Sequence, residues 1–400
     1  MHGARHPMTA EESWVVGEVA AAVGLAEGEA GVRDVLRAVA RREPVAVRTL
    51  SRATELPVPI VSAVCNELRR HGIIEREPPV RLSSHGHELF GRVGGRVPFE
   101  PACPTCAGLG FAVPRSLDGV VAELSVLAEA APRARLELDQ SHCTVETKVR
   151  RVLALDDAGA LDGKRILLLG DDDLTSVAID LIAQRLSRSA GIRSVVVVDV
   201  DPALVSFLRR TLRQAPFSFE AIVHDLREPL PEHLREGADV VITDPPYTVE
   251  GAELFLSRAA QATGQPGRDV FLAFGARRPD ELLRLQRSIL AMGFTLRRLL
   301  RNFNEYLGAG VLGGTSHLYQ LATTSEVRGL VDGLYDGQLY TGDFRQPVRS
   351  YRCKQCGCVE QVGRGETWAS IGALKRARCP SCRGKTFVPL ARGPQAGAAA

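Results

Sequence analysis

The sequence predicts an α/β protein built around a Rossmann-like seven-stranded sheet, with one smaller domain before the sheet domain in the chain and another after it. Two apolar runs of strand length, residues 165–170 and 239–243, break sharply into acidic or turn-forming residues. Between and after them, segments of strand length alternate with amphipathic segments of helix length, which is typical of parallel β-α-β units. Ligands of such sheets bind beyond the carboxyl ends of the strands, so functional residues are expected there.

The composition is that of an ordinary globular protein, with 45% hydrophobic and 24% charged residues in a chain of 400, enough for two or three domains. The 50 basic and 47 acidic residues nearly cancel, so the net charge of +3 gives no argument for a nucleic-acid partner. No apolar run approaches the ~20 residues of a membrane span, so no membrane partner is expected. Nine cysteines, several in C-x-x-C pairs, fit metal binding in a reducing cytoplasm better than disulfides.

Residues 1–95 are predicted to form a winged-helix-like domain. A short helix is expected over residues 10–23, and an amphipathic helix over residues 60–70 precedes two segments, 73–75 and 80–82, that can form the strands of a wing. Such a domain either binds DNA, or it is a dimerisation or lid domain that has the winged-helix shape without the DNA ligand.

Residues 96–150 are predicted to be a linker that carries one C-x-x-C element, Cys103 and Cys106. One such pair is half of a tetrahedral zinc site, and His142 and Cys143 are candidates for the other half. A pair of reduced thiols in a tight turn is an equally open interpretation.

Residues 151–350 are predicted to form the sheet domain. Strands are expected over residues 165–170, 194–199, a segment ending at Asp225, 239–243, 269–274, 294–303 and 317–322, and helices over 174–187, 202–212, 252–260 and 279–292. A final antiparallel pair is how methyltransferase-type seven-stranded sheets end.

Residues 351–392 are predicted to form a zinc ribbon, and residues 393–400 a disordered tail. The ribbon is indicated by two C-x-x-C pairs that bracket 22 residues and supply four ligands, Cys353, Cys356, Cys379 and Cys382. Two pairs at this separation strongly indicate structural zinc. Cys358 is a spare or alternative ligand.

Two aspartates at successive strand ends indicate a ligand that contains adenosine. Asp199 ends the second strand, where a carboxylate accepts both hydroxyl groups of a ribose. Asp225 follows the third strand and is placed to accept from an adenine amino group. Either residue could instead cap a helix or a turn.

The first strand ends in Gly170 and three consecutive aspartates, Asp171, Asp172 and Asp173, where a phosphate- or carboxylate-binding turn would have more glycines. Three negative charges repel a phosphate and a methionine carboxylate alike, and they attract ammonium groups. A helix N-cap explains one of them, with Asp173 the expected one, but not all three. The implied ligand has an adenosine end and a cationic end, as in decarboxylated S-adenosylmethionine or a polyamine beside it.

The fourth strand ends in Asp244-Pro245-Pro246-Tyr247, a turn suited to a nitrogen nucleophile. Asp244 can accept the N–H of an attacking amine, and an aromatic face can hold that amine against the electrophilic carbon. For an aliphatic amine the ring of Tyr247 adds cation–π attraction. The alternative is an ordinary Pro-Pro turn after a buried strand.

These motifs resemble a known family. The run from Gly170 to Ser176, the run from Asp244 to Thr248 and the winged-helix-like domain before them are similar to those of the branched-chain polyamine synthases, the N(4)-bis(aminopropyl)spermidine synthases of thermophilic archaea and bacteria. The resemblance implies transfer of an aminopropyl group from decarboxylated S-adenosylmethionine to the secondary amine of spermidine, with release of methylthioadenosine. One transfer gives a tertiary amine and a second gives a quaternary ammonium.

A more distant resemblance to linear spermidine synthases implies the role of individual residues. Asp173 would hold the aminopropyl ammonium of the donor, and Asp244 with Tyr247 would position and deprotonate the attacking nitrogen. The remaining substrate-binding residues would be Gly170, Asp171, Asp172, Asp199, Asp225, Pro245, Pro246, Thr248 and, more weakly, Glu250 and Glu305 at the far ends of the polyamine.

Other interpretations remain open at this point. The turn at Asp244, with the winged helix and the ribbon, could belong to a nucleic-acid amino-methyltransferase or to a DNA-binding metabolite sensor, although nucleic acid is the weaker expectation. The zinc ribbon departs from the family pattern. A cytoplasmic homodimer is expected.

Overall fold

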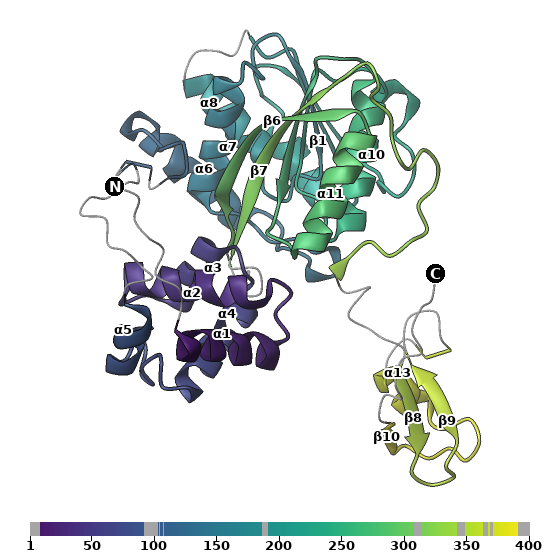
Figure 1. Cartoon of the computed structure of the whole chain (residues 1–400). Coiled ribbons are helices and arrows are strands. Elements are labelled where there is room, and N and C mark those ends of the chain that lie inside the picture. Colours follow the sequence, from purple (N-terminus) through teal and green to yellow (C-terminus); the bar gives the residue numbers. More distant parts are fainter. Residues whose placement is uncertain are drawn as a thin grey trace, which may run out of the picture. The chain divides into compact units, whose positions relative to one another are not determined.

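The computed structural model describes residues 9–91, 103, 105–106, 108–185, 191–307, 314–341, 349–362, 367–368 and 371–390 (Figure 1). The chain divides into two compact units, one of Met1–Leu136 with Gln140–Asp336 and one of Glu137–Asp139 with Gly337–Ala400. The predicted tail, residues 393–400, lies outside the described residues.

The first unit contains a seven-stranded sheet in the order β3-β2-β1-β4-β5-β7-β6. The first five strands in the chain pair in parallel, whereas β7 runs antiparallel to both β5 and β6. The strands are β1 (Arg165–Leu169), β2 (Ser194–Asp199), β3 (Ser218–Val223), β4 (Val240–Thr243), β5 (Asp269–Phe274), β6 (Phe294–Glu305) and β7 (Thr315–Thr323). The predicted α/β sheet and its closing antiparallel pair are confirmed.

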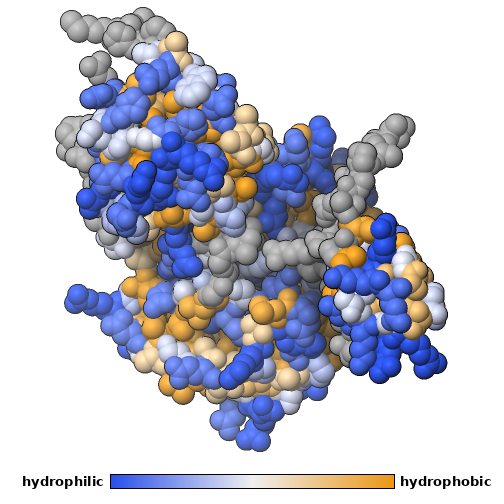
Figure 2. All heavy atoms as spheres, turned by 90° about the horizontal axis from the view of Figure 1, so that it is seen from below, coloured by the Kyte–Doolittle hydropathy of each residue, from blue (hydrophilic) through white to orange (hydrophobic). Residues whose placement is uncertain are grey.

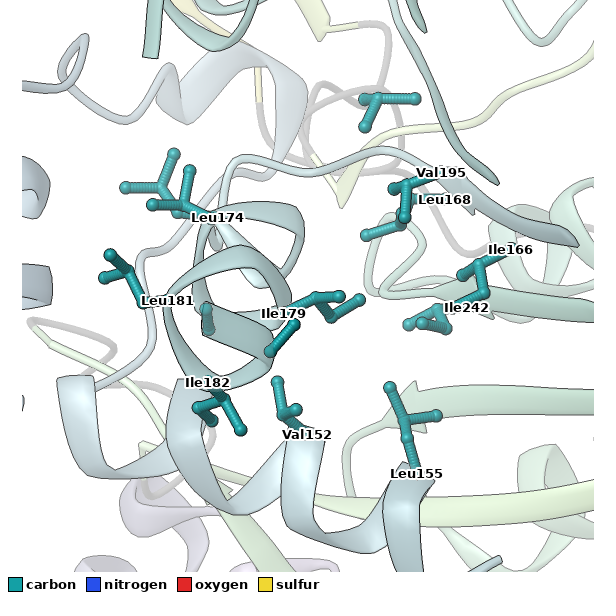
Figure 3. Close-up of a cluster of buried hydrophobic side chains, with 14 of the residues drawn as sticks. Val152, Leu155, Ile166, Leu168, Leu174, Ile179, Leu181, Ile182, Val195 and Ile242 are labelled. Carbon is teal, nitrogen blue, oxygen red and sulfur yellow. The ribbon is translucent and has the colours of Figure 1, made fainter. Parts of the chain in front are cut away.

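Helices cover both faces of the sheet. On one face, α6 (Asp118–Ala130), α7 (Val145–Asp157), α8 (Thr175–Arg185) and α9 (Pro202–Thr211) share a hydrophobic core with β1, β2 and β4. Figure 3 shows Ile179 and Ile182 of α8 pointing toward Val152 of α7, with Ile166 and Ile242 of the sheet beside them. On the other face lie α10 (Val249–Thr263) and α11 (Pro279–Ala291).

The helical part before the sheet has five helices around its own core, α1 (Ala10–Val23), α2 (Gly28–Arg42), α3 (Val47–Thr54), α4 (Val58–Arg70) and α5 (Ser84–Phe90). The predicted wing strands pair through one antiparallel bridge, Ile74 with Leu82, and Val80 bridges to Val45. The winged-helix assignment of this part stays a prediction. Its α3 contacts the end of β6, because the Asn302 side chain donates to the Arg52 carbonyl at 2.9 Å.

The second unit contains a three-stranded sheet in the order β10-β8-β9, formed by β8 (Arg349–Cys353), β9 (Val359–Val362) and β10 (Phe387–Pro389), with the helix α13 (Ile371–Ala377). Its small core contains Cys353, Cys379, Leu374, Val362 and Phe387. This segment, residues 349–390, is called the four-cysteine unit below.

The helix α7 is an element near the site that the sequence analysis missed. Its 13 residues begin inside the segment expected to be a linker and cross the predicted domain boundary at residue 150. In the described part of the chain, no helix is both long and apolar enough to cross a lipid bilayer.

Candidate active site

Acidic side chains gather where three neighbouring strands end. The strands β2, β1 and β4 lie side by side and run in parallel, so the residues that follow them meet at one edge of the sheet. Asp199 ends β2, the three aspartates follow β1, and Asp244 follows β4. Between β1 and the aspartates, Gly170 adopts φ +78°, which only glycine adopts without strain.

Asp171 caps α8. Its carboxylate accepts the backbone N–H groups of Thr175 at 2.7 Å and Ser176 at 3.3 Å, together with the Ser176 hydroxyl at 2.5 Å. Burial nevertheless raises the pKa of Asp171 to about 7, against the lowering effect of these donors. The expectation that Asp173 is the capping aspartate is therefore wrong, because the turn after β1 brings Asp171 to the start of the helix.

Asp199 holds the acidic turn in place. Its two oxygens accept the backbone N–H groups of Asp171 at 3.1 Å and Asp201 at 2.8 Å. Burial raises the pKa of Asp199, and these two donors oppose that rise. Asp225 lies two residues beyond β3, is half-buried, and accepts the Arg227 N–H at 2.9 Å. Both residues thus have backbone contacts, which leave lone pairs for a ligand.

Arg151, on α7, joins two of the predicted site residues. One guanidinium nitrogen lies 2.8 Å from Asp173 Oδ2, and another lies 2.7 Å from Asp244 Oδ2. The Nε atom donates to Asn304 Oδ1 at 2.8 Å, which fixes the plane of the guanidinium. The side chain is 5% exposed, so these contacts are made away from water.

Asp173 is neutralised by protein cations. Besides Arg151, the Lys148 ammonium lies 3.8 Å from its carboxylate, and the Cys143 N–H donates to Oδ1 at 2.5 Å. Burial pushes the pKa of Asp173 up, but Arg151 and Lys148 together bring it down to about 2. Asp173 is therefore a charged group whose charge is already compensated.

Asp244 is held by Arg151 and by Tyr306, whose hydroxyl donates to Oδ2 at 2.5 Å. Burial raises the pKa of Asp244 to about 7, although Arg151 acts in the opposite direction. The ring of Tyr247 stands edge-on to that of Tyr306, with 6.0 Å between the centroids. Burial also raises the pKa of Tyr247 well above its ordinary value, so this phenol remains protonated.

Asp172 is the acidic side chain of this edge that has neither a hydrogen bond nor an ion pair within the described ranges. Burial raises its pKa well above the ordinary value, and the nearby charges of Asp173, Asp244 and Asp199 add to that rise, whereas the charge of Lys148 opposes it. A positive charge placed beside Asp172 would reverse this effect. Within the described residues, the edge therefore has one acidic side chain without a direct partner, next to the pair joined by Arg151.

The other predicted substrate residues have structural contacts. Pro245 and Pro246 are buried, and the Thr248 hydroxyl caps α10 by accepting the Gly251 N–H at 2.8 Å. Glu250 is paired with Arg284 at 2.6 Å.

Glu305 lies 2.9 Å from Arg52 and 3.5 Å from Arg150. Both glutamates proposed for the far ends of a polyamine are thus already in ion pairs.

The four cysteines predicted to bind zinc lie together. Their sulfur atoms are all within 4.8 Å of one another, with 3.6 Å between those of Cys353 and Cys382. Four thiolates at this separation match the donor set of structural zinc. Cys358 is outside this cluster and donates to Glu360 at 3.4 Å.

The first C-x-x-C pair does not complete such a site. Among the residues that the structure describes, Cys103 and Cys106 join no group of three or more potential metal ligands. Cys143 instead lies 3.7 Å from the Lys148 ammonium, and burial raises its pKa to about 12.

The residues that the sequence analysis missed are the cations that compensate the aspartates and the side chains that orient them, namely Lys148, Arg151, Asn304, Tyr306 and Ser316. One signal was present in the sequence. Val149, Val152 and Leu155 recur at helical spacing, and the cations interspersed with them are unusual for an apolar helix face that packs on a sheet.

Known proteins resemble this chain over the sheet domain. The family model "Branched-chain polyamine synthase A C-terminal domain" matches residues 119–328. An N(4)-bis(aminopropyl)spermidine synthase of Thermus thermophilus is 35% identical over 250 residues, 62% of this chain and 68% of that protein. The crystal structure of the branched-chain polyamine synthase from Thermus thermophilus, in complex with N4-aminopropylspermidine and 5'-methylthioadenosine, covers 82% of this chain and 97% of that chain, with a TM-score of 0.68 and 26% identity.

A second kind of relative matches almost the whole chain. An uncharacterised protein of Methanocaldococcus jannaschii is 32% identical over 383 residues, 95% of this chain and 93% of that protein. An alignment of this length must extend into the four-cysteine unit. With a family model that covers more than half of its residues and relatives of this similarity, the chain belongs to the branched-chain polyamine synthase family.

Proposed function

We propose that this protein transfers an aminopropyl group from decarboxylated S-adenosylmethionine to the secondary amine of a polyamine such as spermidine. The observation that carries the proposal is the acidic edge of the sheet, where Asp172 has no hydrogen bond or ion pair within the described residues and Asp244 follows the neighbouring strand. Both reactants are cations, and a buried carboxylate without a partner favours a cation over any other ligand. The Thermus thermophilus relative and a mutein of it, both in complex with N4-aminopropylspermidine and 5'-methylthioadenosine, support the same reaction.

The reaction is a substitution at carbon. The lone pair of the acceptor nitrogen forms a bond to the aminopropyl carbon that is attached to the sulfonium. The S–C bond breaks and its electron pair stays on sulfur, which gives neutral methylthioadenosine. Transfer to a secondary amine releases one proton, which needs a base, whereas transfer to a tertiary amine gives a quaternary ammonium and releases none.

In this proposal Asp199 and Asp225 bind the adenosine end of the donor. Asp199 keeps lone pairs for the ribose hydroxyl groups, and Asp225 has one for the adenine amino group. Gly170 supports the first contact through the backbone, because its φ of +78° precedes the Asp171 N–H that donates to Asp199 Oδ2 at 3.1 Å.

Asp172 takes the role that the resemblance assigned to Asp173. The charge of Asp173 is compensated by Arg151 and Lys148, so it has less attraction to offer a substrate ammonium. We therefore assign the ammonium contact to Asp172, and to Asp173 the positioning of Arg151.

Asp244 accepts the proton of the attacking nitrogen. Arg151 and Tyr306 both bind Oδ2, which leaves Oδ1 for the amine. A carboxylate with a pKa of about 7 is a better proton acceptor near neutral pH than an ordinary aspartate. Tyr247 offers its ring to the same cation.

The test is the release of methylthioadenosine from decarboxylated S-adenosylmethionine by the purified protein, with a mass spectrum of the polyamines formed. Asp172→Asn should raise KM for decarboxylated S-adenosylmethionine about 10- to 100-fold, as expected for the loss of one charged hydrogen bond. Asp280→Asn, on the exposed first turn of α11, is the matched control and should leave KM unchanged. Absence of product with spermidine, spermine and thermospermine would refute the proposed reaction.

We also propose that the four-cysteine unit holds one structural zinc ion through Cys353, Cys356, Cys379 and Cys382. The shared 4.8 Å neighbourhood of the four sulfur atoms supports this. The small core of this unit is consistent with a fold that the metal stabilises. Elemental analysis of the purified protein should give about one zinc per chain, and a Cys353→Ser, Cys379→Ser variant should bind none.

A further inference from the structure

The charges of the chain are distributed unevenly. Residues 349–390 contain nine Lys or Arg and two Glu, whereas the rest of the chain contains 41 basic and 45 acidic residues. The whole chain is nearly neutral only because a basic segment offsets an acidic remainder. Four thiolates with one zinc ion would add a charge of −2 to the segment's +7, so the four-cysteine unit remains strongly positive.

The basic side chains of the four-cysteine unit face solvent. Those that the structure describes as exposed are Arg352, Lys354, Lys375, Arg378, Arg383 and Lys385. Over residues 349–362 and 371–390, the structure shows no ion pair for any of these six side chains. The acidic side chain of these ranges, Glu360, accepts from the Trp368 indole at 2.8 Å and from the Cys358 thiol.

The surface of the unit limits the kind of partner. Hydrophilic side chains cover much of the face of this unit at the right of Figure 2. Within the described residues of the unit, the large apolar side chain that is exposed is Val359, at 45%. One apolar side chain does not make a membrane anchor, which needs a broad apolar face beside the basic one. The rings of Tyr351 and Trp368 are half-buried and thus present part of a flat face to solvent.

We propose that the four-cysteine unit binds nucleic acid through its phosphate backbone. Six unpaired cations on a unit of about 40 residues match the negative charge density of a nucleic acid, and binding would release counterions from the polyanion. The half-exposed rings can stack on unpaired bases, which favours single strands. This function is separate from aminopropyl transfer and does not rest on it.

If the four-cysteine unit binds a nucleic acid, the polyamine product should compete with it for the phosphates. Polyamines are cations that bind the same phosphates, so they compete with the basic side chains of the unit. Binding should therefore weaken as polyamine accumulates, as it does when salt is added. This competition is a second signature of a phosphate contact.

The experiment measures the fluorescence anisotropy of a labelled single-stranded RNA and a labelled DNA duplex of equal length, titrated with the full-length zinc-loaded protein. If the six cations each contact a phosphate, affinity should fall by about 10³ between about 50 and 200 mM salt. Lys354→Gln, Lys375→Gln and Lys385→Gln combined should lower the salt slope by about one per residue.

The matched control replaces three exposed arginines of the sheet domain, Arg193→Gln, Arg213→Gln and Arg287→Gln. It removes the same charge from the chain but should leave nucleic-acid affinity and salt slope unchanged. The zinc content of both triple variants and their release of methylthioadenosine should equal those of the wild type, which shows that the proteins are folded.

Three outcomes would overturn the proposal. The first is that neither oligonucleotide binds at about 50 mM salt. The second is that the two triple variants lose affinity equally, which would assign binding to total charge. The third is that the Lys354 triple variant keeps its affinity for nucleic acid but changes the molar mass in light scattering, which would assign these basic side chains to contact with a second copy of the chain.

Discussion

Removing Arg151 should change both the stability of the protein and the pH at which it works. Arg151→Met deletes a guanidinium that is 5% exposed and lies within 2.8 Å of two carboxylates, those of Asp173 and Asp244. Breaking a buried pair by removing one partner typically lowers the free energy of unfolding by about 3–5 kcal/mol. Two unit charges about 4 Å apart interact by about 4 kcal/mol at an effective dielectric constant of about 20, or about three pKa units.

The pKa of Asp244 should therefore rise above about 7 in this variant. The proposed base must be ionised, and its ionised fraction falls as the pH drops below its pKa. The wild-type rate should thus decrease below a pH of about 7, and the rate of Arg151→Met should decrease from a higher pH. Near neutral pH the variant should be about a hundredfold slower if the pKa moves by about two units.

Arg150→Met is the control for this prediction. Arg150 is the next residue on α7 and is also buried, but it contacts Thr147, the Phe303 carbonyl and Glu305 rather than Asp244. For both variants, the rate of methylthioadenosine release is measured between about pH 6 and 9. Their free energies of unfolding are measured in urea. If Arg151→Met loses stability while its rate decreases over the same pH range as in Arg150→Met, Arg151 is only structural and the reasoning is wrong.

Three further predictions concern single features. Tyr306→Phe removes the hydroxyl that donates to Asp244, so the decrease in rate at low pH should begin at a higher pH, by less than in Arg151→Met; an unchanged pH profile would contradict this. Asp171→Ala removes the cap of α8 and should lower the free energy of unfolding by about 0.5–2 kcal/mol in urea, a loss that Asp280→Ala should not share. Ile179→Ala, in the core of Figure 3, should cost about 2–5 kcal/mol without changing KM for the polyamine.

The strands could be predicted closely because their apolar runs stop at turn-forming residues. β2 and β5 have the predicted bounds, and β1 ends one residue earlier, at Leu169. Asp199 and Asp244 could be placed at one edge for the same reason, since the carboxyl ends of neighbouring parallel strands meet.

The state of each aspartate could not be predicted in the same way. Which acid caps a helix depends on the path of a four-residue turn, and the path here, with Leu174 at φ +54°, selects Asp171. Which acid is compensated depends on cations that come from α7, more than 20 residues earlier in the chain. Adjacent residues in the sequence thus have three different roles.

The contact between α3 and β6 links the helical part of the first unit to the candidate site. Arg52 reaches Glu305, which lies between Asn304 and Tyr306, two of the side chains that orient Arg151. The family model, which starts at residue 119, omits this contact. Truncation to the sheet alone would remove the ion pair that holds Glu305, so an excised sheet domain is expected to turn over more slowly than the intact first unit.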